Sequence, residues 1–193
     1  MPVYEIHLTI SPIERAAWPG LAACADAMGA TPLVIELARG VARLQPMLTL
    51  RHAGSFETAC QAAEAATAHP ALMGHDVRRC KIEREISDPA PENAPDCVRY
   101  FEWHGRLTVQ AAAQRALAGL CQTHGGHLSA NAQRHSDLRY VTLREAGSGT
   151  ILGARVACLS AALAEQGWAF SKQRWECVVF DSNLDLDAGW LEP

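Results

Sequence analysis

The sequence of 193 residues has few of the features that mark membrane, secreted or nucleic-acid-binding proteins. No uninterrupted apolar run approaches the roughly 20 residues that a membrane-spanning helix needs. The segment from Met1 to His7 lacks the basic start and the apolar stretch of a signal peptide, so we expect a cytoplasmic protein that contacts no membrane. A formal net charge of -4 disfavours nucleic acid as the main partner, because basic side chains supply most of that affinity.

Paired cysteines are missing as well. The seven cysteines are an odd number and form no C-x-x-C pair, so we interpret most of them as small buried apolar side chains, not as disulfides or zinc ligands. Hydrophobic residues make up 49% of the chain and charged residues only 20%, which argues against disorder. The sequence therefore predicts one large or two small globular domains.

An internal repeat is the most informative feature that the sequence does contain. The segment Thr49 to Ser55 recurs 93 positions later as Thr142 to Ser148, with one difference in seven residues. The same offset relates four further pairs: Gly74 and Gly167, Lys81 and Arg174, Glu83 and Glu176, and Asp88 and Asp181. Near the start of each half, Glu5-Ile6-His7 matches Glu102-Trp103-His104 at an offset of 97. Two homologous halves are the simplest interpretation.

Each half has the pattern strand, helix, strand, strand, helix, strand. In the first half we expect these elements at 4–10, 11–29, 33–37, 47–51, 55–69 and 77–86. In the second half we expect them at 100–107, 110–124, 127–133, 139–144, 150–166 and 170–180. Ser11, Pro12 and Glu14 give the first helix a start signal, and Pro19 should kink or restart it.

This order predicts an α+β protein of two ferredoxin-like (βαββαβ) modules in tandem, related by a pseudo-twofold axis. Each module would have a four-stranded antiparallel sheet with both helices on one face. The expected units are a first module (1–88), a proline-rich linker (89–96), a second module (97–182) and an acidic C-terminal tail (183–193). We expect the tail to pack down through four apolar side chains, Leu184, Leu186, Trp190 and Leu191.

The sheet face away from the helices is the predicted functional surface. A period of two places on it seven basic side chains, Arg51, Arg79, Lys81, Arg106, Arg144, Lys172 and Arg174. Against them stand five glutamates, Glu5, Glu83, Glu85, Glu102 and Glu176, which leaves the face at +2 before its histidines. A basic face with histidines predicts a small anionic ligand, since arginine pairs with carboxylate or phosphate in a forked geometry.

The candidate catalytic residues are His7 and His104, with Glu5 and Glu102 beside them on the same strands. The candidate ligand-binding residues are the two anion clamps Arg51 and Arg144 with four charged partners, Lys81, Arg174, Glu83 and Glu176. We assign no cofactor and no metal site, because the group Cys121, His124 and His127 matches no common zinc spacing.

Two interpretations of this face stay open. In the first, the protein is a small-molecule enzyme or metabolite-binding protein whose anionic ligand binds there. In the second, it is a non-catalytic assembly or regulatory module, and the face forms an interface between lobes or between the subunits of a homo-oligomer. RNA binding through Tyr100 and Tyr140 is a third hypothesis, which the net charge disfavours.

Overall fold

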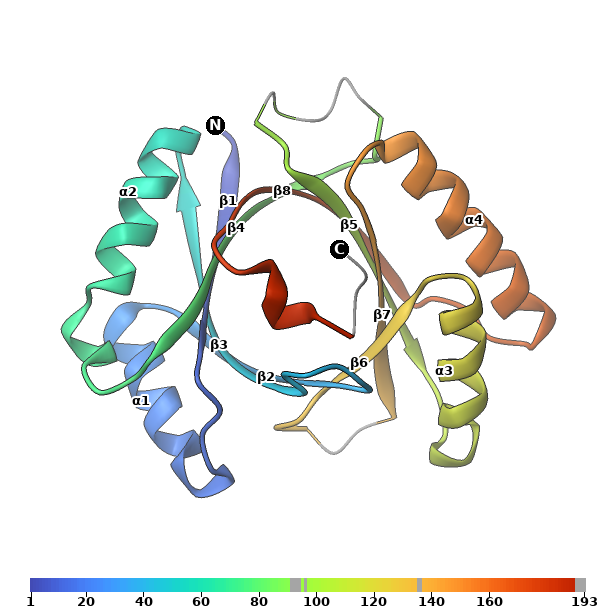
Figure 1. Cartoon of the computed structure of the whole chain (residues 1–193), viewed down its shortest axis with the longest axis horizontal. Coiled ribbons are helices and arrows are strands. Elements are labelled where there is room, and N and C mark those ends of the chain that lie inside the picture. Colours follow the sequence, from blue (N-terminus) through green and yellow to red (C-terminus); the bar gives the residue numbers. More distant parts are fainter. Residues whose placement is uncertain (91–94, 96, 135–136, 190–193) are drawn as a thin grey trace.

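Eight antiparallel strands and four α-helices make up the computed structural model, which describes residues 1–90, 95, 97–134 and 137–189 (Figure 1). The first half contains β1 (Val3–Ile10), α1 (Trp18–Met28), β2 (Thr31–Leu37), β3 (Leu44–Ala53), α2 (Phe56–Thr67) and β4 (Val77–Ile86). The second half contains β5 (Tyr100–Thr108), α3 (Gln114–Thr123), β6 (His127–Asn131), β7 (Leu138–Glu145), α4 (Gly149–Glu165) and β8 (Lys172–Asp181). The predicted order of elements is confirmed in both halves.

The start of the first helix differs from the prediction. Ser11 does not begin it; a short 3-10 turn spans Arg15–Ala17 and α1 begins at Trp18. Pro19 therefore lies in the first turn of α1, where its missing N–H would have no partner within the helix in any case.

The strands close into one barrel in the order β1-β3-β2-β6-β7-β5-β8-β4. The expectation of two separate four-stranded sheets is therefore wrong, although each half does keep the ferredoxin-like strand order. The two sheets join at both edges, where β4 pairs with β8 and β2 pairs with β6. The physical reason is that an open sheet edge exposes unpaired N–H and C=O groups, and full closure removes every edge.

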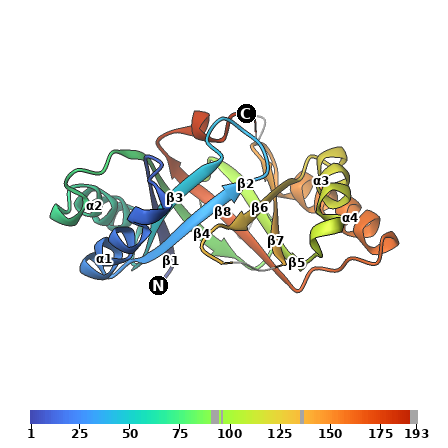
Figure 2. The same cartoon turned by 90° about the horizontal axis from the view of Figure 1, so that it is seen from below.

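All four helices lie outside the barrel. Figure 2 shows α1 and α2 at one end of the long axis, α3 and α4 at the other, and the barrel between them. On β1, Tyr4, Ile6 and Leu8 point to the helices and are buried in the first core, while Glu5 and His7 point into the barrel. The predicted polar face is therefore the lumen of the barrel. Within the described ranges, no helix is long and apolar enough to cross a membrane.

The segment after β8 crosses one mouth of the barrel. Its 3-10 turn η5 (Leu184–Asp187) lies at one end of the strands in Figure 2, and Asp187 is only 2% exposed. Leu184 is 48% exposed, so the predicted apolar packing of this residue is wrong, and a buried carboxylate fixes the tail instead. Trp190, Leu191 and most of the predicted linker lie outside the described residues. The division into two modules stays a prediction.

Gly105 on β5 provides a test of the second core. A Cβ atom at this position would lie 2.3 Å from Trp103 and 2.5 Å from Phe170, whose rings pack edge to face. We expect Gly105→Ala to lower the free energy of unfolding by about 1–3 kcal/mol, measured by urea denaturation. Gly119→Ala on α3 is the matched control; nothing lies within 4 Å of its added methyl group, and it should stabilise the helix slightly. Equal stability of the two variants would contradict this packing.

Candidate functional site

Four neighbouring strands, β1, β4, β8 and β5, carry most of the predicted site residues on their lumen side. Their side chains form one network, here called the charged wall: Glu5, His7, Lys81, Glu83, Glu102, His104, Arg174 and Glu176. The strand register explains the grouping, since Glu5 lies opposite Glu83 and Glu102 lies opposite Glu176. Eight of the ten predicted residues thus come together.

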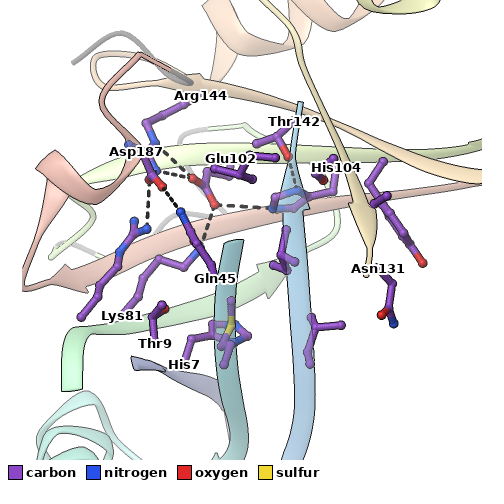
Figure 3. Close-up of a pocket in the computed structure, with 18 residues that line it drawn as sticks. His7, Thr9, Gln45, Lys81, Glu102, His104, Asn131, Thr142, Arg144 and Asp187 are labelled. Carbon is purple, nitrogen blue, oxygen red and sulfur yellow. Dashed lines mark hydrogen bonds and ion pairs between the residues drawn. The ribbon is translucent and has the colours of Figure 1, made fainter. Parts of the chain in front are cut away.

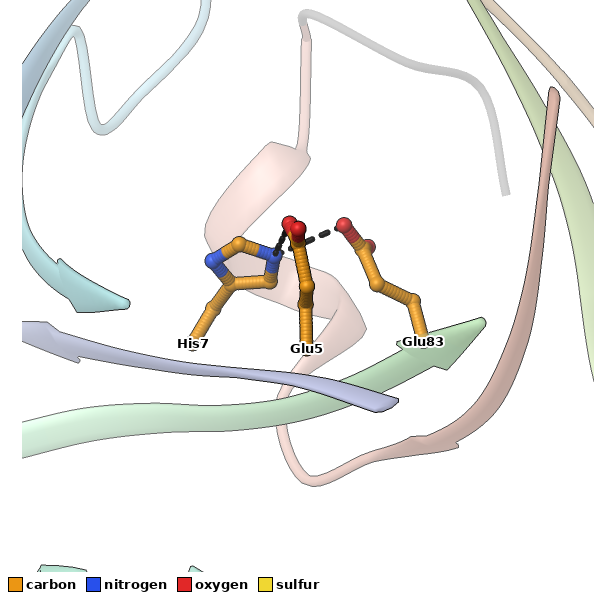
Figure 4. Close-up of side chains that lie close together, drawn as sticks. All are labelled: Glu5, His7 and Glu83. Carbon is orange, nitrogen blue, oxygen red and sulfur yellow. Dashed lines mark hydrogen bonds and ion pairs between the residues drawn. The ribbon is translucent and has the colours of Figure 1, made fainter. Parts of the chain in front are cut away.

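His7 is held at both ring nitrogens. Its Nδ1 lies 2.9 Å from Thr49 Oγ1, and its Nε2 lies 2.7 Å from a Glu83 carboxylate oxygen and 3.9 Å from Glu5 (Figure 4). The threonine comes from β3 and the glutamate from β4, the two strands that flank β1. Since the threonine fixes the ring orientation, Nε2 faces the two carboxylates.

His104 repeats this arrangement in the second half. Its Nδ1 lies 2.9 Å from Thr142 Oγ1, and its Nε2 lies 3.0 Å from Glu176 and 3.5 Å from Glu102. Both histidines and their glutamates were predicted from the sequence, but the threonines were not predicted as the groups that orient the rings.

Two cations join the halves through the charged wall. Lys81 Nζ lies 2.6 Å from Glu83 of its own half and 2.9 Å from Glu102 of the other half. Arg174 lies 2.8 Å from Glu176 and, across the junction, 2.9 Å from Glu5. The face predicted to meet another lobe thus connects the two halves of one chain.

The charges of the wall shift the pKa values of its buried groups. Within the wall four carboxylates share two permanent cations, and Arg144 pairs with Glu102 from outside it. Burial alone would lower the pKa of His104, but the charge of Glu176 and hydrogen bonds to Glu102 and Glu176 raise it to about 10. Burial would likewise raise the pKa of Glu102, but Lys81 and Arg144 hold it well below its usual range.

A cavity of about 250 Å³ lies between the charged wall and the opposite strands β2, β3, β6 and β7 (Figure 3). Its charged and imidazole lining comprises His7, Arg79, Lys81, Glu102, His104, Arg144 and Asp187. Its apolar lining comes mainly from Leu33, Ile35, Leu37 and Met47. Ser129, Asn131, Tyr140 and Thr142 complete the far side. One molecule bound here would contact an apolar surface and a charged surface at once.

Arg144, a predicted anion clamp, already holds two carboxylates. Its guanidinium lies 2.8 Å from Glu102 and 2.6 Å from Asp187, over the ring of Tyr100. Asp187 also lies 3.0 Å from Arg79. Asp187 was not predicted as a site residue because the tail lies outside the repeat, so the sum of +2 for this face omitted a buried carboxylate.

Arg51, the other predicted clamp, lies at the opposite mouth of the barrel. Its side chain is 69% exposed, and its only carboxylate partner among the described residues is Glu5 at 3.7 Å. It lines a separate groove and does not reach the cavity. The single predicted anion site is therefore two sites, because antiparallel closure of the halves sends equivalent residues to opposite ends of the barrel.

The two histidine clusters also have the donor set of a metal centre. Each offers one imidazole nitrogen and two carboxylate oxygens within 4.8 Å of one another: Glu5, His7 and Glu83, and Glu102, His104 and Glu176. Lys81 and Arg174 already neutralise these carboxylates, and a metal ligand requires an unprotonated imidazole nitrogen. The raised pKa of His104 therefore opposes metal binding at the cluster of the second half.

No protein-family model matches this sequence, and no curated protein matches it. Several solved structures align along most of this chain with low TM-scores. A heme-binding protein from Thermus thermophilus has a TM-score of 0.32 at 12% identity, over 92% of this chain and 91% of that one. A candidate monooxygenase from Fusobacterium nucleatum has a TM-score of 0.38 at 10% identity, over 100% and 97%. A chlorite dismutase mutant from Candidatus Nitrospira defluvii has a TM-score of 0.32 at 10% identity, over 91% of this chain and 90% of that one. Scores this low assign neither a family nor an activity.

The raised pKa of His104 predicts a pH-dependent stability. Folding favours the protonated ring, so its contribution is complete below pH 6.5, the ordinary pKa, and is lost as the pH rises towards 10. We expect the unfolding free energy to fall by an amount on the order of 3 kcal/mol over this range, measured by urea denaturation. His104→Gln should flatten the curve, whereas His75→Gln leaves His104 intact and should keep the slope. An unchanged slope in His104→Gln would show that the ring is not protonated in the folded protein.

Proposed function

We propose that the protein binds a small organic anion with an apolar body inside the barrel. The observation that carries the proposal is a cavity with a charged surface on one side and an apolar surface on the other. Ligand sites in proteins commonly combine an apolar lining with a few polar groups that fix orientation.

The charge of the cavity lining supports an anion. The lining has three permanent cations, Arg79, Lys81 and Arg144, and two carboxylates, Glu102 and Asp187, which leaves it at +1 before the two histidines are counted. Outside the lining, Arg79 also pairs with Asp181. The other three glutamates of the charged wall do not line the cavity: Glu5, Glu83 and Glu176. They pair with His7, His104 and Arg174 on the side away from the cavity. A ligand therefore meets more cations than carboxylates among the side chains that line the cavity.

The side opposite the charged wall supports an apolar body. Leu33, Ile35 and Leu37 alternate along β2 and point into the lumen, and Met47 of β3 lies beside them. The hydroxyl group of Tyr140 has no hydrogen-bond partner within the described part of the chain, so it is available to a ligand.

Proton transfer by His7 and His104 remains part of the proposal. Both rings line the cavity and pair with a glutamate, so the protonated ring can stabilise negative charge on a bound molecule or pass a proton to it. Glu83 and Glu176 would then act as the counter-ions that hold the rings in place.

The test compares three probes of one shape and different charge: benzoate, benzyl alcohol and benzylamine. We expect benzoate to raise the melting temperature most and benzylamine least, because the cavity lining is positive. At one hundred times its dissociation constant a ligand adds about 2.7 kcal/mol, which a thermal-shift assay detects readily.

Ser129→Phe fills the cavity from β6 and should abolish the benzoate shift. Thr150→Phe adds the same ring on the exposed surface of α4 and should leave the shift intact. An equal benzoate shift in both variants, or a larger shift with benzylamine than with benzoate, would reject the proposed ligand class.

Asp187 should limit the affinity for anions. Its carboxylate occupies Arg144 and Arg79, so Asp187→Asn keeps the shape of the side chain but leaves the cavity lining one charge more positive. We expect benzoate to bind about fivefold more tightly, measured by calorimetry. Asp185→Asn changes an exposed residue of the same turn and should not alter the affinity. Weaker binding to Asp187→Asn would place the anion away from these arginines.

A further inference from the structure

A second hollow opens at the mouth of the barrel opposite the tail. It is a groove of about 530 Å³ lined by Pro2, Val3, Glu5, Arg51, Arg84, Glu85, Ile86, Ser87 and Arg174. It shares no lining residue with the cavity. Glu5 and Arg174 of the charged wall form its floor, so the wall stands between the two hollows.

The internal repeat relates this mouth to the mouth that the tail closes. Arg51 is the counterpart of Arg144, and Glu5 is the counterpart of Glu102. Both arginines contact the matching glutamate, but Arg144 also holds Asp187 at 2.6 Å. Within the described residues, nothing takes the place of Asp187 beside Arg51. The contacts of Arg144 thus show that an arginine at this position of the repeat can bind a second carboxylate beside its glutamate.

The path of the backbone explains why no carboxylate of the described chain fills this place. Asp88 ends the first repeat as Asp181 ends the second, but the chain after Asp181 turns across the mouth of the barrel. After Asp88 the chain turns outward, and the carbonyl group of Pro89 packs against Gly149 at the start of α4. A Cβ atom added to Gly149 would lie 1.9 Å from the carbonyl oxygen of Pro89. Arg51 therefore stays 69% exposed, whereas Arg144 is 9% exposed.

Arg51 is the exposed arginine of the groove. Arg84 and Arg174 also line the groove, with Glu5 and Glu85, but each of these two arginines already has an interaction partner. Arg174 binds both glutamates, at 2.9 Å and 3.1 Å, so they are already neutralised in part. Arg51 is more than 3.5 Å from its one partner and can present its planar N–H groups to an oxyanion in a forked geometry.

We propose that the groove is a second ligand site, which binds the carboxylate of a small organic acid through Arg51. The carboxylate takes the place that Asp187 takes beside Arg144. This site is distinct from the cavity and stands whether or not the cavity binds benzoate.

The experiment titrates succinate into the ¹⁵N-labelled protein and follows the amide and arginine Nε–H signals by NMR. We expect shifts at Val3, Arg51 and Ser87, and about tenfold weaker binding to Arg51→Gln, since the variant keeps a polar side chain but loses a charge-assisted contact. Arg115→Gln removes another exposed arginine, on α3, and should bind succinate like the wild type. Succinamide, the neutral analogue, should not bind.

Two outcomes would overturn the proposal. One is equal succinate affinity in Arg51→Gln and the wild type. The other is loss of succinate binding in the cavity-filled Ser129→Phe variant, which would place the ligand in the cavity. Ser129→Phe blocks only the cavity, and Arg51→Gln changes only the groove. Rejection of benzoate binding in the cavity therefore leaves the test of succinate binding in the groove intact.

Discussion

The crossed ion pairs of Lys81 and Arg174 are the interaction on which the rest of the structure depends. Each cation binds a glutamate of its own half and a glutamate of the other half inside the barrel. Buried carboxylates without such partners would cost several kcal/mol each, so these pairs favour closure of the two halves in one register. The raised pKa of His104 has a more local cause, since Glu102 and Glu176 belong to its own half.

The difference between the two mouths of the barrel comes from the tail. The two halves place equivalent arginines at opposite ends, and a symmetric barrel would treat them alike. The tail supplies Asp187 to one end only, where it neutralises Arg144 and Arg79 and forms one side of the cavity. The other end keeps an exposed arginine and an open groove. A short segment outside the repeat therefore makes two unlike sites from one repeated arrangement.

Local patterns in the sequence were sufficient to predict the elements and the contents of the lumen. Alternation along β1, β4, β5 and β8 placed twelve charged or imidazole side chains on one face, and the structure joins eight of them in the charged wall. Closure was not predictable in this way, because it depends on pairing between strands far apart in the chain. One signal was available: Leu33, Val34 and Ile35 are apolar on both faces of β2, which is typical of a strand buried on both sides. The burial of Asp187 had no signal of this kind, since a single aspartate in an acidic tail resembles its exposed neighbours.

The two unlike sides of the lumen are the physical basis of the ligand proposed for the cavity. A barrel of eight strands is just wide enough for its side chains to fill. Here the long side chains of the wall pair with one another, and the opposite strands offer Leu33, Ile35 and Leu37 with the short side chains of Ser129 and Thr142. The cations that line the cavity are paired with carboxylates on their own side, and the side chains of β2 opposite them are apolar. A cavity of about 250 Å³ remains between two surfaces that do not complement each other, and a molecule with one anionic end and one apolar end complements both.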